Sequence, residues 1–370
     1  MALVERYASS AGGGANNGTS EADAWSFVNM IAAGGASAGH RVNFKGNHSL
    51  GVNSVIANAG SATSPIIIRG YKTVPGDLSY GGALYGGRTY RNGPLVTSDI
   101  PVITCAGYTL GGSALNLWQD MAITSTYNGN AFLLGTNSFM AHCKVSNTGT
   151  GAAAYGCSIP TQSCAFDCDF EFAGASGGLG GCTGAGYFVH CRATASGAVT
   201  GRCFDLTTGT VCVNCVAHSA IGDGFYGSNA ANTYLLVNCS SIGNGSDGFH
   251  QITGATRISF IINSLLTDCG AYGIYAVQAA AAIAAPFNRI ARNTTAASSG
   301  ATDWLTATDF GRQVTADPVG SDYEDYAGKN FNLVGVSPGR AAGSWPWFDL
   351  GALQRQEPQK VIRKRPNVRP

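Results

Sequence analysis

Four ionisable side chains recur at a nearly constant spacing in the middle of this 370-residue sequence. Asp120, His142, Asp167 and His190 follow one another at intervals of 22, 25 and 23 residues. Carboxylates beside imidazoles are the groups that general acid–base catalysis uses. If each interval is one turn of a coil, the backbones at Asp120 and Asp167 lie about 9.6 Å apart, with His142 between them. That separation is close to the roughly 6.5–9.5 Å between carboxyl groups in inverting glycoside hydrolysis, so these four are the candidate catalytic residues.

Other charged residues follow the same spacing and are candidates for contacts with a glycan. Lys144, Asp169 and Arg192 form a neighbouring column, and Asp247 and His250 belong to an Asp-Gly-Phe-His sequence that resembles Asp223-Gly-Phe225. An alternative is that such charges only pair across adjacent turns, which stabilises a sheet by a few tenths of a kcal/mol per pair. The Asp-Gly sequences also suit chain corners, where glycine supplies positive φ.

We expect no metal and no cofactor. A metal at His142, Asp167 and His190 is the alternative, but their spacing does not by itself make the three side chains converge.

The elements that position these residues are predicted by an internal repeat between about residues 114 and 277. The segments LWQDMAI, FMAHCKV, AFDCDFEF, YFVHCRA, VCVNCVA, LLVNCSS and FIINSLL align at a period of about 24 residues. Their aligned central residues are Met121, Cys143, Cys168, Cys191, Cys215, Cys239 and Asn263. Repetition at such a period is the signature of a solenoid.

Alternation within the segments predicts which side chains point inward. From Cys164 to Phe172 the even positions are apolar and the odd positions include Asp167 and Asp169, a period of two that is typical of a strand with one buried face. The five aligned cysteines then form an inward column of free thiols, which we prefer to disulfides or a metal site. The isolated Cys212-Val-Asn-Cys215 motif lies inside this strand pattern and is weak evidence of redox chemistry.

The N-terminus carries the pattern of a capping helix. Apolar residues at 24, 25, 27, 28 and 31 form one helical face behind a candidate N-cap at Thr19 or Ser20. Residues 39–46 would be the first strand and residues 65–70 a later one. A solenoid needs such a cap, because an open strand edge invites aggregation.

The capping helix, the Pro65-Ile-Ile-Ile-Arg-Gly70 strand, the ladder of repeats and the closing sequence up to Asp349-Leu-Gly-Ala-Leu353 resemble the pectate-lyase-like superfamily. The resemblance implies an all-β, right-handed parallel β-helix. We expect a cap over residues 1–45, the β-helix over 46–310, a closing segment over 311–355 and a basic tail over 356–370. The superfamily includes polysaccharide lyases, glycoside hydrolases, adhesins and virion proteins, so it implies no single activity.

The C-terminal tail is basic and contains prolines. Arg363, Lys364, Arg365 and Arg369 make it a candidate arm that docks on an acidic partner, whereas the alternative is a solvated, disordered tail. Nucleic-acid binding is a weaker interpretation, because one short basic run lacks interleaved aromatic residues.

These observations favour a virion-associated structural or adhesive protein, such as a bacteriophage capsid-decoration, fibre or tailspike-like component that binds glycans. The absence of a leader sequence and the unpaired cysteines suit assembly in a host cytoplasm. No membrane span is expected, and the resemblance makes a homo-oligomer, a trimer for example, an expected partner.

The alternative is a polysaccharide lyase or glycoside hydrolase that uses the outward ladder. The sequence lacks the paired-aspartate and Gly-His-Gly motifs of a polygalacturonase-like enzyme, which weakens that alternative. A secreted or cell-surface adhesin is a third hypothesis.

Overall fold

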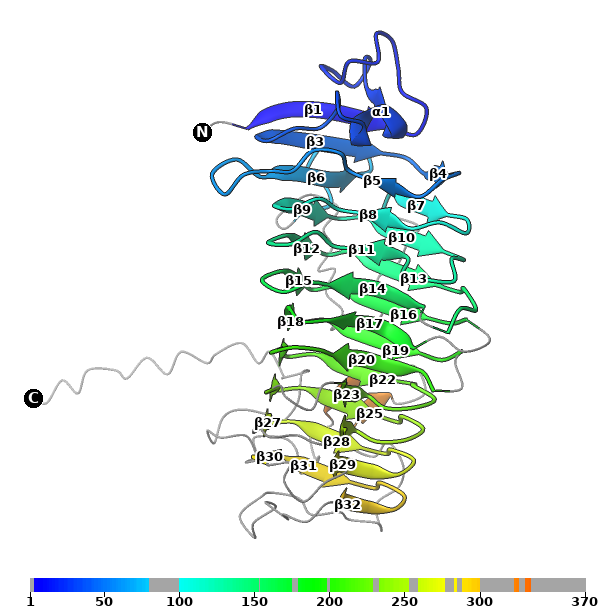
Figure 1. The fold of residues 1–370 in the computed structure, drawn as a ribbon, viewed down its shortest axis with the longest axis vertical. Helices are drawn as coiled ribbons and strands as arrows, with labels where there is room; N and C mark the ends of the chain where they lie inside the picture. Colours follow the sequence, from blue (N-terminus) through cyan, green and yellow to red (C-terminus); the bar gives the residue numbers. More distant parts are fainter. Residues whose placement is uncertain are drawn as a thin grey trace, which may run out of the picture.

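The protein is a long coil of short strands, seen side-on in Figure 1. The computed structural model describes residues 3–79, 100–152, 154–174, 179–197, 200–228, 233–252, 259–276, 283–284, 288–299, 323–325 and 330–333. Within them the strands form three long parallel sheets, here called A, B and C, with 12, 10 and 10 strands.

Sheet A contains, from one end to the other, β2 (Trp25–Ser26), β1 (Val4–Ser9), β3 (His40–Lys45), β6 (Ile66–Tyr71), β9 (Asn116–Gln119), β12 (Phe139–Ala141), β15 (Cys164–Phe166), β18 (Tyr187–Val189), β21 (Val211–Val213), β24 (Leu235–Val237), β27 (Ser259–Ile262) and β30 (Ile283–Ala284). Sheet B contains β4 (His48–Leu50), β7 (Val102–Cys105), β10 (Ala122–Ser125), β13 (Lys144–Asn147), β16 (Asp169–Phe172), β19 (Arg192–Ala195), β22 (Val216–His218), β25 (Ser240–Ile242), β28 (Leu265–Thr267) and β31 (Arg289–Ala291). Sheet C contains β5 (Ser54–Val55), β8 (Leu110–Gly111), β11 (Phe132–Leu133), β14 (Tyr155–Ile159), β17 (Gly180–Gly184), β20 (Arg202–Leu206), β23 (Phe225–Gly227), β26 (Phe249–Gln251), β29 (Tyr272–Ala276) and β32 (Ala296–Ser299).

The chain passes from sheet A to sheet B to sheet C and then begins the next turn, so every third strand pairs in parallel with its predecessor. This arrangement is a right-handed parallel β-helix, which confirms the predicted fold class. Because each turn buries its inner face only on its neighbours, one continuous core fills the coil.

The corner between sheets A and B corrects the predicted strand pattern. Residues 164–172 form two strands, β15 and β16, separated by Asp167, whose φ of 52° is left-handed. The left-handed residue breaks the alternation of inward and outward side chains. Ala165 points inward before the corner and Cys168 points inward after it, although strict alternation would place residues three apart on opposite faces. Cys164 and Phe166, predicted to lie in the core, are therefore only partly buried.

The column of thiols is confirmed. Cys143, Cys168, Cys191, Cys215 and Cys239 are all buried and unpaired, and each Sγ donates to a backbone carbonyl in its own or the preceding turn. The assignment of Asn263 to this column was wrong by one residue. Asn263 continues the left-handed corner, since Val237 pairs with Ile262, and Ser264 takes the place that follows Cys239.

The second strand of each turn is confirmed in sheet C, where Cys157 pairs with Cys182 and Phe225 with Phe249. In the turn between them Phe204 holds the inward place, rather than its neighbour Cys203.

The N-terminal helix is shorter than predicted. Helix α1 (Phe27–Ile31) begins after Ser26, whose hydroxyl accepts from the Asn29 backbone N–H, so the N-cap is neither Thr19 nor Ser20. The first strand is β1 rather than residues 39–46, because β1 pairs with β3 along its whole length. The cap region 1–45 therefore supplies strands to sheet A as well as the helix.

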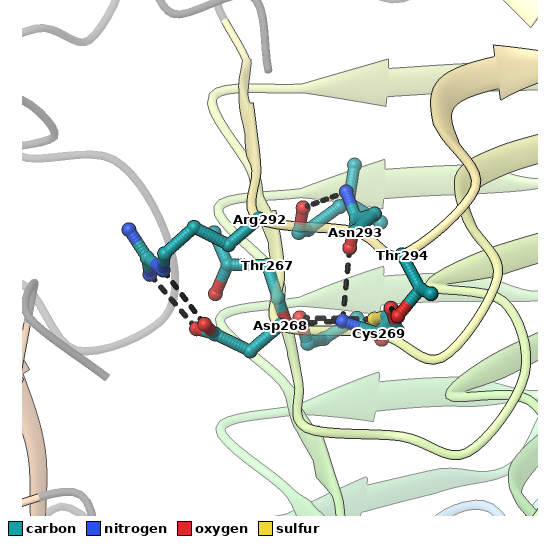
Figure 2. A network of polar contacts seen from close by, with 8 residues as sticks. Thr267, Asp268, Cys269, Arg292, Asn293 and Thr294 are labelled. Atoms are coloured by element: carbon teal, nitrogen blue, oxygen red, sulfur yellow. Dashed lines mark hydrogen bonds and ion pairs between the residues drawn. The ribbon is translucent and has the colours of Figure 1, made fainter. Parts of the chain in front are cut away.

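The corner between sheets B and C holds a buried ion pair near the C-terminal end of the coil, shown in Figure 2. Arg292 donates from Nε and an Nη to the two carboxylate oxygens of Asp268 at 2.7 and 2.8 Å. Both residues have left-handed φ angles. Beside them Asn293 accepts from the Cys269 N–H and donates to the Leu266 carbonyl, which links adjacent turns.

The closing segment 311–355 is described only at β33 (Tyr323–Asp325) and β34 (Asn330–Leu333), which pair antiparallel. The basic tail 356–370 lies outside the described residues. In the part of the chain that the structure describes, no helix has the length and apolarity needed to span a bilayer.

Candidate functional site

Asp120, His142 and Asp167 are brought together at the corner between sheets A and B. The imidazole of His142 lies between the two carboxylates, with Nδ1 3.4 Å from Asp120 Oδ1 and Nε2 3.5 Å from Asp167 Oδ2. Ser79 Oγ donates to Asp120 Oδ2 at 2.8 Å. The predicted order of acid, imidazole and acid on adjacent turns is thus present.

These residues are corner residues rather than members of an exposed flat face. Asp120, His142, Asp167 and His190 all have φ between 51° and 57°. Asp120 is only 2% exposed. Burial lowers the pKa of His142, but hydrogen bonds and charges from Asp120 and Asp167 outweigh it and raise the pKa to about 9. Near neutral pH the corner is an imidazolium held between two carboxylates, and the catalytic role of these residues stays a prediction.

His190 lies one turn further along and makes different contacts. Its Nε2 accepts from the Asn214 amide at 2.8 Å, and its ring lies 5.4 Å from that of Phe166. Phe166 separates the His190 ring from His142, whose ring is 6.1 Å away on its other side.

Lys144, Asp169 and Arg192 form one column of sheet B, as predicted. Lys144 is partly exposed and pairs with Glu171 at 3.2 Å. Asp169 and Arg192 are buried, and Arg192 Nε donates to His218 Nε2 at 2.7 Å. The burial lowers the pKa of Arg192. A glycan on this face would meet Lys144 more readily than the other two residues.

A second polar and aromatic column runs along sheet C. Asp205 pairs in register with Tyr226, Tyr226 with His250, and His250 with Tyr275. The ring centroids are 5.0 Å apart for Tyr226 and His250 and 4.8 Å apart for His250 and Tyr275. We call this column, together with Arg202 and Tyr272, the sheet C strip.

Charged groups extend the strip at its N-terminal end. The guanidinium of Arg202 lies 3.3 Å above the Tyr226 ring and pairs with Asp205 Oδ2 at 3.2 Å. Tyr155 Oη donates to the same carboxylate oxygen. The other oxygen, Asp205 Oδ1, is buried without a hydrogen-bond partner among the residues that the structure describes.

The glycan-contact candidates Asp247 and His250 meet Asp223 next to the strip. His250 Nδ1 lies 3.0 Å from Asp247 Oδ2 and 3.5 Å from Asp223 Oδ2. Burial lowers the pKa of His250, but the two carboxylates outweigh it and raise the pKa to about 9. Burial would raise the pKa of Asp223, but the contact with His250 lowers it overall. The two Asp-Gly sequences therefore supply two carboxylates that face one nitrogen of a second imidazolium.

Asp223, Asp247 and His250 also have the geometry of a cation site. Each offers one ligand atom, and these atoms lie within 4.8 Å of one another. A metal would bind neutral imidazole, so it would have to displace a proton from a group whose pKa is about 9. Near neutral pH the imidazolium itself supplies the positive charge that the carboxylates need.

The sequence analysis missed most of the strip, although a signal was present. Phe225, Phe249 and Ile274 align as inward residues, and each is followed directly by Tyr226, His250 or Tyr275. In a strand the residue after an inward one points outward. Asp205 carries the same signal, because it directly follows the inward residue Phe204. Arg202 has no such signal, because it lies two residues before Phe204, where alternation predicts an inward side chain.

The docking candidates Arg363, Lys364, Arg365 and Arg369 lie outside the described residues, so their role stays a prediction.

The coil is similar to a solved structure along almost its whole length. The crystal structure of pectate lyase Pel9A matches with a TM-score of 0.64 and 16% sequence identity, covering 96% of this chain and 97% of that chain. A double mutant of the periplasmic alginate epimerase AlgG matches with a TM-score of only 0.37 and 10% identity over 75% of each chain. No family model and no curated protein matches the sequence. The chain therefore has the pectate-lyase-like, right-handed parallel β-helix fold.

Proposed function

We propose that this protein binds a polysaccharide along the sheet C strip. The observation that carries the proposal is the register of Asp205, Tyr226, His250 and Tyr275 on successive turns. An extended polymer lying parallel to the coil axis would meet an aromatic or hydrogen-bonding group at each turn. The fold that the chain shares with a structure named a pectate lyase agrees with this class of ligand.

The strip offers both kinds of contact that a sugar ring requires. Tyr272 and Tyr275 stack with centroids 5.2 Å apart and present apolar ring surface, while their hydroxyls are polar. Arg202, whose side chain is partly exposed, can donate hydrogen bonds to sugar hydroxyls. When His250 is protonated, the strip and its neighbours carry two cations and three carboxylates: Arg202 and His250, and Asp205, Asp223 and Asp247. The excess negative charge would repel a polyanion but not a neutral glycan.

Affinity electrophoresis against neutral and uronic-acid polysaccharides tests the proposal. For a neutral glycan that retards the protein, we expect Tyr275→Ala and His250→Gln each to weaken binding about 10-fold, which corresponds to about 1.4 kcal/mol. Tyr127→Ala is the matched control, because Tyr127 is half-buried and lies outside the strip. Circular dichroism confirms that each variant retains its β structure.

Two results would overturn the strip as the binding face: no glycan in a broad panel retards the protein, or the two strip variants bind as well as Tyr127→Ala does. Retention only on polyuronic chains would overturn the charge argument while leaving the strip in place.

Polysaccharide cleavage is the second candidate function. It is favoured by the two arrangements in which a histidine with a raised pKa lies against two carboxylates, at His142 and at His250. Such a group could donate a proton to a glycosidic oxygen. Release of reducing ends or unsaturated products, abolished by Asp167→Ala or by Asp223→Ala, would support cleavage and identify which arrangement acts. Product release that neither variant affects would exclude both sites.

We further propose that the protein is a structural or adhesive component of a virion or a similar assembly, docked through its basic tail. The twelve free cysteines support assembly in a reducing compartment. Co-sedimentation of the purified assembly with full-length protein and with protein lacking residues 356–370 tests the docking. Equal co-sedimentation of the two forms would show that the tail is not the docking arm.

A further inference from the structure

The outward face of sheet A is apolar over a long stretch. In β9, β12, β15, β18, β21, β24 and β27 the second-last residue is buried in the core and the residues on either side of it lie in outward positions, of which Ala141 alone is buried. In register, these outward positions form two columns along the coil. All but Gln119 are apolar: Leu117, Phe139, Cys164, Tyr187, Val211, Leu235 and Phe260 in one column, and Gln119, Ala141, Phe166, Val189, Val213, Val237 and Ile262 in the other. We call these residues the sheet A patch.

The patch ends where the same sheet becomes charged. In β1, β3 and β6 the outward positions include Glu5, Arg41 and Arg69. Glu5 pairs with Arg41 at 2.9 Å, and Arg69 donates to Asn43. Charged side chains are therefore compatible with the outward face of sheet A, yet the patch contains none. The two other sheets do carry charge over the same turns, Arg202 and Asp205 in sheet C for example.

Part of the patch is open to solvent in the single chain. Tyr187 is 51% exposed and Phe260 38% exposed, and most of the other members are partly exposed. Six steps of about 4.8 Å give the patch a length of roughly 30 Å. Strands of three residues are roughly 10 Å wide, so the two columns themselves cover roughly 300 Å². With the flanking corners, about six residues of extended chain, the face is about 20 Å wide and covers roughly 600 Å², or about 1,200 Å² for two copies, which reaches the lower limit of stable protein interfaces.

Polar residues border the patch on both long sides. The corner column of Asp120, His142 and Asp167 lies along one side. Exposed Asn137 and Gln162 lie at the corner with sheet C on the other side. An uncharged apolar centre with a polar rim is the usual anatomy of a protein–protein interface.

We propose that the sheet A patch is the face through which this chain associates with a second copy of itself. A second copy fits for two reasons. The patch has no charge that a partner must complement, so an identical surface is a suitable partner. Both copies also carry side-chain rows at the same spacing of one turn, so the rows of one can pack between the rows of the other. The proposal is independent of polysaccharide binding, because the strip lies on a different sheet.

Light scattering coupled to gel filtration tests the association. We expect the full chain, of 37.9 kDa, to elute with a mass at least twice that value. Tyr187→Glu places a charge at the centre of the patch and should shift the protein to the monomer. Ile221→Glu is the matched control, because Ile221 is 46% exposed but lies at the corner between sheets B and C. It should leave the mass unchanged.

Cys164 provides a second readout inside the patch. It is the one cysteine of the twelve that is not fully buried. Maleimide should label Cys164 slowly in the wild-type oligomer and at least 10-fold faster in Tyr187→Glu. A wild-type monomer at concentrations above 100 µM, on the order of the weakest specific affinities, would overturn the proposal. So would an oligomer that Tyr187→Glu leaves intact, or a monomer with protected Cys164, since the patch would then be covered by the chain itself.

Discussion

Two groups of three residues each place an imidazole against two carboxylates. His142 lies between Asp120 and Asp167, whereas Nδ1 of His250 faces both Asp223 and Asp247. In each case burial alone would disfavour the imidazolium, and the two carboxylates reverse that effect. The groups also link adjacent turns of the coil, so the same contacts can stabilise the fold and hold a proton for a ligand.

The raised pKa of His142 predicts that stability depends on pH. The folded-state pKa of about 9 lies above the unfolded value near 6.5, so the folded chain binds the proton more tightly. The contribution is fully present below about pH 6.5 and is lost as pH rises through about 9. Allowing for solvent screening, we expect His142→Gln to cost roughly 1–2 kcal/mol at pH 6 and little at pH 10.

Urea denaturation of the wild type and of His142→Gln at pH 6, 8 and 10 measures this dependence, with His48→Gln as the control, because burial lowers the pKa of His48. A difference in the free energy of unfolding between wild type and His142→Gln that stays constant from pH 6 to pH 10 would contradict the raised pKa of His142.

At the scale of the elements, the corner between sheets A and B determines where side chains point. In the seven turns from β9 to β27 one left-handed residue lies there, drawn from Asp, His and Asn, whereas the corner after β3 uses Gly46. Asn and Asp tolerate this conformation better than other residues with a Cβ. The corner shifts the alternation by one residue, which is why Phe166 and Val189 lie outside and build the sheet A patch instead of the core.

The left-handed conformation of Asn238, whose φ is 52°, predicts how substitutions at this position rank in their effect on stability. Asn238→Gly should change the free energy of unfolding by less than about 1 kcal/mol, because glycine adopts this conformation freely. Asn238→Val should cost roughly 2 kcal/mol or more, because a β-branched residue is strained there.

Thermal and urea unfolding of the two Asn238 variants rank them against the wild type. Val213→Ala is a control for the loss of neighbouring apolar contact, since Val213 directly precedes the equivalent corner residue one turn earlier. Equal stabilities of the glycine and valine variants would show that the left-handed conformation does not constrain this corner.

At the scale of the whole molecule, the three sheets share one core but present different outer surfaces. Sheet A is apolar on its outer face from β9 to β27, sheet B has the buried Asp169 and Arg192, and sheet C carries the aromatic and ionic strip. The core common to them is lined by thiols, whose burial raises the pKa of Cys143, Cys168 and Cys191 well above the ordinary value. Thiols held neutral in this way behave as small apolar groups.

The buried column predicts that the native protein is nearly inert to alkylation. We expect iodoacetamide at pH 8 to modify at most Cys164 in the native state and all twelve cysteines in 6 M guanidinium, with mass spectrometry counting the adducts. Rapid native modification of Cys168 or Cys191 would contradict a closed core.

The sequence alone determined the coil and its period. The spacing of Cys143, Cys168, Cys191, Cys215 and Cys239 predicted a column of inward thiols, because like residues at a constant interval must stack in a solenoid. The spacing of Asp120, His142 and Asp167 likewise predicted an ionic ladder.

The tertiary structure alone decided which neighbours of that column face the solvent. A single left-handed residue at the corner between sheets A and B changes which residues point inward, while the repeat of about 24 residues stays the same. An analysis that assumes continuous alternation through the corner therefore assigns the residues before it to the wrong face. It also decided that Arg202, which the alternation places inward, lies over the ring of Tyr226 one turn later. That arrangement depends on the register of strands separated by a whole turn, and register is set by packing between turns rather than by local sequence.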